Sequence, residues 1–534
     1  MRQLLYNGHI YQQRGQFTSA LLIEDGYILK CGSDQELLAH QDQDVTLIDL
    51  QGKTVLPGFN DSHLHFYMSS VAFQTVELYG ATSIDMIIER AQQFINNHPE
   101  AQGKALFGRG WNQDYFETEP RLINRLDLDR ISTDFPIVFS RACGHVVSVN
   151  SKTLEILGIH ALTPQVDGGQ FDLDAQGQPN GVFRENAIDL LSSLREPLSS
   201  QDRLNLLTSI SQIANQYGIT SVQTNDITVG SEEGSAIEET YRHYSALNPT
   251  VRIYHQLCFT DIDTLYARIQ SGYHQGENQF NRYGPLKIFI DGSLGARTAK
   301  MRQPYHDDPS TRGIECMTSS VLHEFINLAD QNNIQVAIHA IGDGAITQVL
   351  NSYQNVIQTE NKNRHGIIHC QITDMPILNR FKALDILAYV QPIFLHYDMH
   401  IVEDRVGQGL ASTSYAFGTM EELGLHVAYG TDSPVEGLNV FNNIHCAINR
   451  QDLKSFPENG FYPNEKVDLE TAIDNLTIGG AYASFEEDHK GRLLPGYMAD
   501  LIVIDQPIFQ QDYAQIKDVQ VTMTMVNGKV VYTR

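Results

Sequence analysis

The chain has 534 residues, of which 42% are hydrophobic and 19% are charged, a composition typical of folded, water-soluble proteins. Its 64 acidic and 37 basic side chains give a net charge of −27, which repels polyanions, so we expect neither a nucleic-acid partner nor a membrane partner. No segment approaches the ~18 consecutive apolar residues of a transmembrane helix, and the first residues soon become polar, so we expect a cytoplasmic protein. The six scattered cysteines form no CxxC pair, which favours reduced thiols over disulfides.

The two ends of the chain resemble each other in composition. Short runs rich in β-forming residues, such as "SALLIEDGYILKCG" near the start and "VTMTMVNGKVVYTR" at the end, are interrupted by Asp-Gly and Asn-Gly. These dipeptides are strong signals for hairpin turns. We therefore predict a small β-sandwich domain that both ends build together, from residues 1–57 and 485–534.

The middle of the chain alternates short apolar runs with helical stretches, the pattern of a parallel sheet in an α/β fold. Eight such runs are found, which is the strand count of a TIM (β/α)8 barrel. We predict this barrel over residues 58–484. The expected strands are "KTVLPGFNDSHLHF" (53–66), 218–226, 251–259, 286–293, 335–343, 366–371, 386–393 and 426–434.

The interval between the first two expected strands is too long for a single crossover. It contains strand-like runs of its own, "GKALFGRGWNQ" and "PIVFSRACGHVVSVNS", and the helical stretch "IDMIIERAQQFINNH". We predict an inserted α+β subdomain after the first strand, over residues 68–200.

Two histidines stand one residue apart in "LPGFNDSHLHF", residues 56–66. In a strand, residues i and i+2 point to the same face, so the rings of His63 and His65 should project side by side. Such a pair of imidazoles can bind a metal ion, whereas histidines on a protein surface need no such arrangement. The pair therefore predicts a metal site at the end of the first strand.

Other expected strands also carry metal-ligand side chains where a barrel has its active site, near the carboxyl ends. Each alone has an ordinary explanation, as a core histidine, a turn aspartate or a lysine whose ammonium reaches water. Together with the histidine pair they indicate Zn²⁺ or a similar divalent ion, bound as one or two ions. These further candidate ligands are Lys287, His339, His369 and Asp432.

Lysine is the unusual member of this set, because an ammonium group repels a cation. A desolvated lysine loses its proton more easily, and the neutral amine can add CO₂ to form a carbamate. We hypothesise that Lys287 is carboxylated and that the two carbamate oxygens bridge two ions.

This layout resembles the amidohydrolase superfamily: HxH after strand one, lysine on strand four, histidines on strands five and six, and aspartate on strand eight. It is most similar to the amidohydrolase-3 branch, which includes YtcJ-like proteins and N-substituted formamide deformylase. The resemblance covers nearly the whole chain and implies a barrel with an insertion and a sandwich built from both ends. The motifs that carry it are "PGFNDSHLH", "GWNQ", "GHVVSVNS", "KIFIDGSLGART", "AIHAIGDGA", "IIHCQ", "YGTDSPV" and "PGYMADLIVID". One departure is Ile368, where the family commonly has glutamate before the strand-six histidine.

From these residues we predict a metal-dependent amidohydrolase that cleaves a C–N bond, an amide or N-substituted formamide, in a small molecule. Asp432 is the expected catalytic base and then acid. The alternatives are a deaminase on the same barrel and a non-catalytic metal-binding scaffold, and a homodimer stays open. Candidate substrate-binding residues are Trp111 and His145 on the insertion and Arg297 after strand four, although packing or a surface ion pair also accounts for them.

Overall fold

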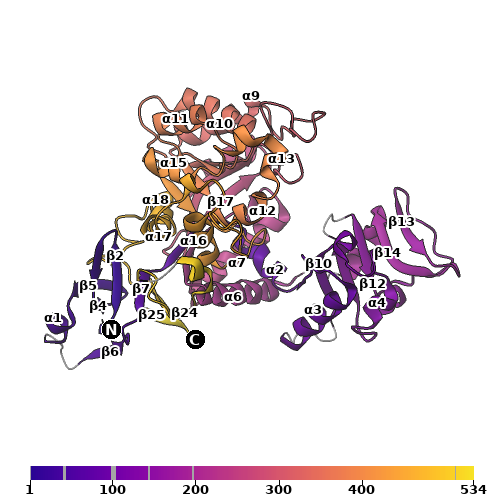
Figure 1. Ribbon diagram of the computed structural model, residues 1–534, viewed down its shortest axis with the longest axis horizontal. Helices are drawn as coiled ribbons and strands as arrows, with labels where there is room; N and C mark the ends of the chain where they lie inside the picture. Colours follow the sequence, from indigo (N-terminus) through magenta and orange to yellow (C-terminus); the bar gives the residue numbers. More distant parts are fainter. Residues whose placement is uncertain (1, 40–43, 98–103, 142–144, 195–197, 511–512) are drawn as a thin grey trace. The chain divides into compact units, whose positions relative to one another are not determined.

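The computed structural model describes residues 2–39, 44–97, 104–141, 145–194, 198–510 and 513–534. The chain divides into two compact units, of which the first combines Met1–Ser69 with Arg203–Arg534 and the second is Ser70–Asp202 (Figure 1). The bounds predicted for the insertion, 68–200, are close to the bounds of the second unit. No helix in the described ranges is both long and apolar enough to cross a membrane.

Eight parallel strands form the sheet at the centre of the first unit, which confirms the predicted TIM barrel. The barrel closes where the segment after the last strand meets the first strand, through His65 N–H to Ser433 O at 2.8 Å and Asp432 N–H to His63 O at 2.8 Å. The strands are β8 (Phe59–Leu64), β15 (Ile219–Thr224), β17 (Arg252–Phe259), β18 (Asn281–Phe289), β19 (Val336–Ala340), β20 (Gly366–His369), β21 (Leu387–Val390) and β22 (Val427–Tyr429).

Helices connect successive barrel strands, as the alternating sequence pattern predicts. Helices α9 and α10 contact each other and β19, and they lie on the outside of the barrel in Figure 1. The longer connecting helices are α6 (Ser200–Gln216), α7 (Glu232–Ala246), α8 (Ile262–Gln270), α9 (Ser319–Gln331), α10 (Asp343–Val356), α11 (Met375–Leu384) and α16 (Val440–Asn449).

The first expected strand, 53–66, is two strands that belong to different sheets. Strand β7 (Thr54–Pro57) pairs in the sandwich, and β8 begins two residues later in the barrel. Gly58 lies at the break, where an added Cβ would come within 2.3 Å of Thr220 Oγ1. Only a residue without a side chain lets the backbone pass this close to β15.

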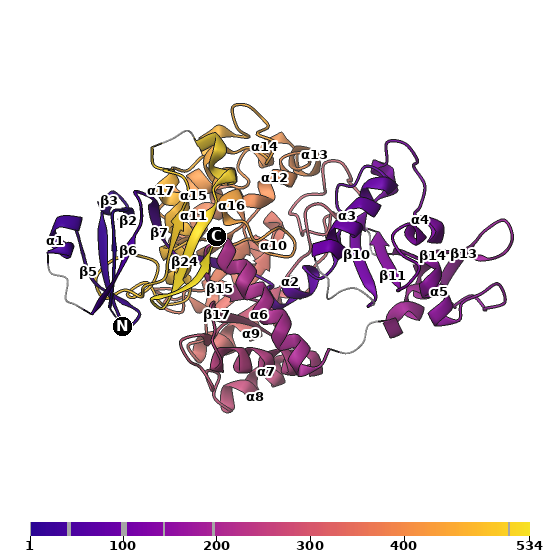
Figure 2. The same cartoon turned by 90° about the horizontal axis from the view of Figure 1, so that it is seen from below.

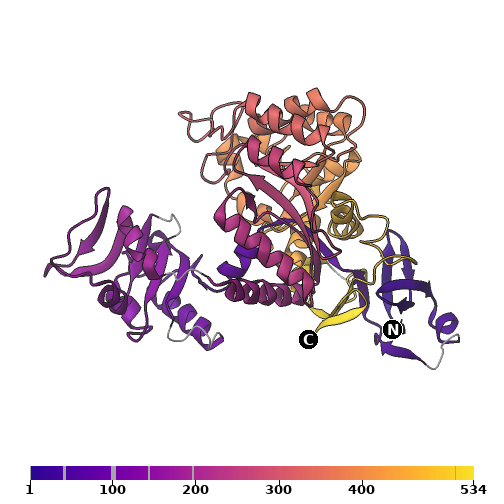
Figure 3. The same ribbon diagram turned by 180° about the vertical axis from the view of Figure 1, so that it is seen from behind.

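Both ends of the chain contribute to the sandwich, as predicted. A sheet in the order β25-β24-β23-β7-β2-β3 joins carboxy-terminal to amino-terminal strands, which lie side by side in Figures 2 and 3. It packs on a sheet in the order β5-β4-β1-β6 through a shared apolar core that includes Leu5, Val55 and Leu501. The strands are β1 (Arg2–Tyr6), β2 (His9–Gln13), β3 (Gln16–Thr18), β4 (Ala20–Glu24), β5 (Tyr27–Gly32), β6 (Val45–Asp49), β23 (Leu501–Ile504), β24 (Val521–Val526) and β25 (Lys529–Thr533).

Helix α18 (Ile478–Ala483) closes the amino-terminal end of the barrel. Its carbonyl oxygens and that of Ser484 accept hydrogen bonds from side chains that lie where barrel strands begin: Arg364 to Tyr482 O, Gln335 to Ala483 O and Arg282 to Ser484 O. These bonds satisfy the last carbonyls of the helix, which have no partner within it.

A buried ionic cluster fixes the segment after α18 to the barrel. Glu486 accepts a hydrogen bond from Lys490 Nζ and lies 3.1 Å from Arg282 Nη1. Nearby, Arg252 on β17 pairs with Asp500, with 2.7 Å between Nε and Oδ2. Burial opposes ionisation of Glu486, but Lys490 and Arg282 hold the pKa of its carboxyl at about 2, below the ordinary 4.5.

The low pKa of Glu486 predicts a pH-dependent contribution to stability. A carboxyl whose pKa is lowered by folding stabilises the protein above its unfolded pKa, and this stabilisation is lost as pH falls toward the folded value. Glu486→Gln should therefore lower the urea midpoint at pH 6, and the difference from wild type should shrink between about pH 4.5 and pH 2. Exposed Glu422 is the matched control. A difference for Glu486→Gln that stays constant over this range would contradict the assignment.

The second unit is an α+β structure with its own sheet, in the order β13-β14-β12-β11-β10-β9. Its helices pack on this sheet around two apolar clusters, one of which contains Trp111. The main elements are β9 (Val76–Glu77), α3 (Ile84–Asn97), β10 (Leu106–Trp111), α4 (Arg125–Asp129), β11 (Ile137–Arg141), β12 (Val146–Val149), α5 (Ser151–Leu157), β13 (Gly169–Leu173) and β14 (Pro179–Glu185). Five cysteines are free thiols, and Cys143 lies outside the described residues.

Candidate metal centre

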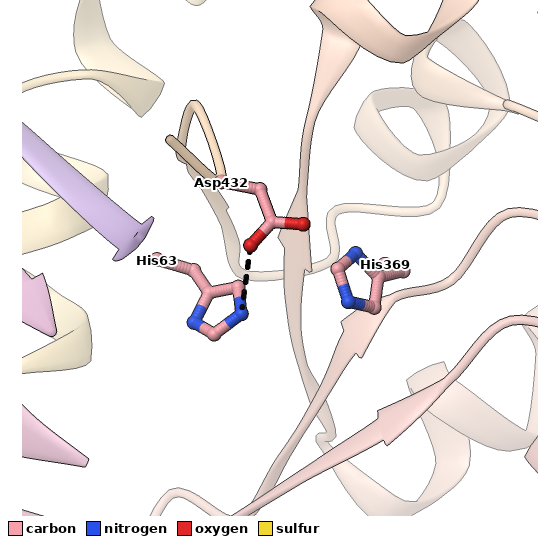
Figure 4. Close-up of side chains that lie close together, drawn as sticks. All are labelled: His63, His369 and Asp432. Atoms are coloured by element: carbon pink, nitrogen blue, oxygen red, sulfur yellow. Dashed lines mark ion pairs between the residues drawn. The ribbon is translucent and has the colours of Figure 1, made fainter. Parts of the chain in front are cut away.

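Three of the predicted ligands converge at the carboxyl ends of the barrel strands. Ligand atoms of His63, His369 and Asp432 all lie within 4.8 Å of one another, and all three residues are buried (Figure 4). His65 joins them, because its Nε2 and that of His63 each lie 3.4 Å from Asp432 Oδ1. The same-face arrangement expected for the histidine pair thus brings both rings to one carboxylate.

His339 and Lys287 border this group. The ring of His339 lies 4.5 Å from that of His369, centroid to centroid. Lys287 is 2% exposed, and its Nζ lies 4.5 Å from the ring centroid of Phe289, which in turn lies 5.3 Å from that of His339. The structure therefore gathers all six predicted ligands at one end of the barrel.

Hydrogen bonds fix which nitrogen each histidine presents to the centre. Nδ1 of His63 lies 2.6 Å from Gln256 Oε1, and Nδ1 of His369 lies 2.8 Å from Gln391 Oε1. Nδ1 of His65 faces the carbonyl of Asn225 at 2.6 Å. These partners are oxygen acceptors, so each Nδ1 carries the proton and each Nε2 keeps a lone pair for a metal.

His339 has the opposite arrangement. Its Nε2 lies 3.1 Å from the carbonyl oxygen of Gly292, which can only accept, so Nε2 carries the proton. The lone pair is then on Nδ1. His339 thus has Nδ1 free for a metal, whereas the other three histidines have Nε2.

The backbone is strained at two of the candidate ligands. His369 and Asp432 have φ values of 81° and 57°, and Cys370 has 48°. Such conformations are uncommon for residues with side chains and persist where the surrounding structure enforces them. Strain at strand ends is typical of functional sites, and here it sets the direction of two ligand side chains.

The electrostatics of the site fit a divalent cation. Burial holds the pKa of His63 and His369 well below 6.5 and lowers that of His339 to about 3, so these rings are neutral ligands. For His65, burial is outweighed by Asp432, which raises the pKa. Two buried atoms, Asp432 Oδ1 and Lys287 Nζ, have no hydrogen-bond partner among the described residues. Neutral imidazoles and a buried carboxylate oxygen that accepts no hydrogen bond from the described residues are a donor set that suits Zn²⁺.

Several supporting residues were not anticipated from the sequence. Gln256 lies within the expected strand "VRIYHQLCF" and Gln391 directly follows the apolar run "LAYV", and a polar amide in each of these places was the available signal. Gln256 is itself oriented, because its Nε2 donates to Ser62 O at 3.0 Å. Asp61 is buried beside the histidine pair and accepts hydrogen bonds from the backbone of His63 and Thr431.

The three candidate substrate-binding residues are engaged elsewhere. Trp111 is fully buried in the insertion core, and its Nε1 donates to Phe139 O at 3.0 Å, so packing accounts for its position. His145 is exposed and lies 2.9 Å from Glu185. Arg297 forms a two-point ion pair with Asp307, at 3.1 and 2.8 Å. Their role in substrate binding stays a prediction, and none of these contacts supports it.

Ile368, the departure from the family pattern, is fully buried. It packs in an apolar cluster with Leu387 and Tyr389. A glutamate at this position would have to enter that cluster, so the structure accommodates isoleucine here because its surroundings are apolar.

Comparison with known proteins agrees with the sequence motifs. Residues 46–532 match the family model described as "Amidohydrolase family". YtcJ of Bacillus subtilis, which is assigned to the amidohydrolases, is 31% identical over 540 residues and covers 100% of both chains. N-substituted formamide deformylase of Arthrobacter pascens is 25% identical over 551 residues, covering 100% of this chain and 99% of its own. A crystal structure of an uncharacterized metal-dependent hydrolase from Pyrococcus furiosus superimposes with a TM-score of 0.74 at 28% identity, covering 96% of this chain and 100% of that one. The chain therefore belongs to the amidohydrolase family and is a metal-dependent hydrolase.

Proposed function

We propose that this protein hydrolyses a C–N bond of a small molecule, an amide or an N-substituted formamide. The observation that carries the proposal is the buried group of His63, His369 and Asp432, whose ligand atoms lie within 4.8 Å of one another. The similarity to N-substituted formamide deformylase supports the substrate class. The net charge of −27 favours a small substrate over a polyanionic partner.

The residues that would hold the metal form two sets. In a two-ion arrangement His63, His65 and Asp432 would hold one Zn²⁺, His339 and His369 would hold the other, and carboxylated Lys287 would be shared by both. A bound divalent ion would lower the pKa of water and polarise the scissile carbonyl. One ion held by a subset of these residues remains the alternative.

Asp432 is the proposed catalytic base and acid. Its Oδ1 is buried, has no hydrogen-bond donor among the described residues and lies at the centre of the site. It accepts a proton as the oxygen of water bonds to the carbonyl carbon, and it then transfers that proton to nitrogen as the C–N bond breaks. The products are a carboxylic acid, formic acid for a formamide, and an amine.

Two other functions use the same residues. A deaminase would release ammonia from a ring, but such sites rely on one ion without a lysine bridge, and Lys287 is buried beside the ligands here. A non-catalytic scaffold would bind metal without turnover. The positive φ values of His369 and Asp432 favour catalysis, because strained backbone conformations cluster at active sites.

The test is turnover of an amide panel by protein purified without added metal. Elemental analysis gives the metal content, and formate, amine and ammonia are measured separately for formamides, other amides and aminated rings. Amine with an equal amount of acid is expected, and Asp432→Asn should lower kcat by about 10²–10⁴-fold. Ammonia from aminated rings alone would establish a deaminase, and full metal content without any turnover would establish a scaffold.

A further inference from the structure

A second carboxylate, that of Asp291, lies next to His339, one of the candidate metal ligands. Asp291 follows β18 and is 3% exposed. Its Oδ1 lies 3.5 Å from Nε2 of His339, the nitrogen that points away from the centre and toward the carbonyl of Gly292. None of the roles derived above uses this side chain.

The Asp291 carboxylate is held rigidly by the backbone. Oδ1 accepts the N–H of Ile341 at 3.1 Å, and Oδ2 accepts those of Gly342 at 2.9 Å and Lys300 at 2.8 Å. Since Ile341 and Gly342 follow β19, the carboxylate links the ends of two neighbouring strands. Burial raises the pKa of the Asp291 carboxyl to about 7, and the three backbone donors oppose this rise only in part. The same three hydrogen bonds leave the carboxylate little freedom to rotate.

Among the described residues, the Asp291 carboxylate has no ion-pair contact other than the His339 ring, although the charge of Lys300 also lowers its pKa. The Lys300 ammonium is directed to Glu315 and Gln348, each at 2.7 Å. A buried carboxylate without a counter-ion is costly, and a divalent cation on the far side of the His339 ring would offset this cost.

We propose that Asp291 is a positioning residue, which orients the His339 ring and strengthens its Nδ1 as a metal ligand. A carboxylate near the protonated nitrogen of a ligating imidazole fixes the tautomer and increases the electron density on the other nitrogen. Asp291 and the Gly292 carbonyl therefore act together on the Nε2 proton. The inference rests on the proposed function in that it takes His339 as a ligand.

A purely structural role of Asp291 predicts a different effect of its loss on stability and on metal affinity. If Asp291 only fastens the strand ends, its loss should lower stability and leave the ring and the metal affinity unchanged. Asp127 is a matched control, because it is also a buried aspartate that accepts a backbone N–H group, that of Asn124 at 2.9 Å. The other hydrogen bonds of its carboxylate come from Arg121, and none joins it to a histidine ring in the described residues.

The experiment compares Asp291→Asn, Asp291→Glu and Asp127→Asn with wild type as full-length, metal-free protein. Zn²⁺ affinity is measured by competition with a chelator, and the ring ¹⁵N resonances of His339 are recorded without metal, assigned with a His339→Gln variant. Asp291→Asn should weaken Zn²⁺ binding by about 10- to 100-fold and shift the His339 resonances. Asp291→Glu should give a smaller loss, and Asp127→Asn should change neither quantity.

Unchanged Zn²⁺ affinity and unchanged His339 resonances in whichever Asp291 variant folds would overturn the proposal. An equal loss of Zn²⁺ affinity in Asp127→Asn would also overturn it. The ring resonances need neither metal nor substrate. Failure of the amide-hydrolysis proposal would therefore leave this readout intact, and the two failures can be told apart.

Discussion

Lys287→Ala is expected to abolish hydrolysis while the barrel remains folded. The amine is buried and has no hydrogen-bond partner among the described residues, and burial lowers its pKa to about 8, so a substantial fraction is neutral at mildly alkaline pH. In the modification we propose, the neutral nitrogen would bond to the carbon of CO₂ and release a proton, which would replace a cation beside the ligands with a carbamate that carries two oxygens. Because Lys287 is 2% exposed, the alternative in which its ammonium reaches water does not describe this position.

The measurement combines activity, metal content and ¹³CO₂-labelled NMR. In the wild-type protein, Nζ of Lys287 lies 4.5 Å from the ring centroid of Phe289. Lys287→Met is the matched control for packing, because it keeps an unbranched apolar side chain against this ring. Both variants should lose activity and bound metal, only wild type should show a carbamate resonance, and short carboxylic acids should partly restore the alanine variant. An unmodified ammonium in metal-replete, CO₂-equilibrated protein would defeat the carbamate assignment.

Removal of residues 485–534 is expected to give insoluble protein. The deletion removes β23, β24 and β25, which leaves β7 without its antiparallel partner and exposes the apolar face formed by Leu5 and Val55. It also removes Glu486 and Asp500, so Arg282 and Arg252 lose the partners that neutralise them. Unpaired strand edges and buried charges without partners both disfavour the folded state.

Deletion of residues 529–534 alone is the control. It removes β25, an edge strand that pairs only with β24 in the described sheet, so we expect soluble protein with a lower Tm. Expression, sedimentation and activity of the two deletions should therefore differ sharply. Soluble, active protein ending at residue 484 would show that the barrel does not depend on the composite sheet.

The sequence alone was sufficient to predict the architecture. Strand periodicity located the eight barrel strands, because buried parallel strands are short continuous apolar runs bounded by turns. The strand-end rule then selected His63, His65, Lys287, His339 and His369 as candidate ligands. The fold predictions succeed because they depend on residue type and spacing, which local sequence carries.

Other features were decided only by tertiary contacts. The break between β7 and β8 at Gly58 depends on the approach of Thr220, about 160 residues away in the chain. The place of Trp111 in the insertion core, with its Nε1 donating to the Phe139 carbonyl, is likewise set by tertiary contacts. A side chain's partners, unlike its periodicity, are set by segments distant in sequence.

In the metal centre, too, some features follow from local sequence and others from tertiary contacts. The sequence determined that imidazoles and a carboxylate would meet at one end of a barrel, since ligand type and strand register are local properties. Which nitrogen each imidazole offers was decided by Gln256, Gln391 and the Gly292 carbonyl, which belong to other strands and loops. The position of a single proton on each ring depends on a hydrogen bond that only the folded barrel creates, and this is the physical reason why tertiary structure was needed to assign it.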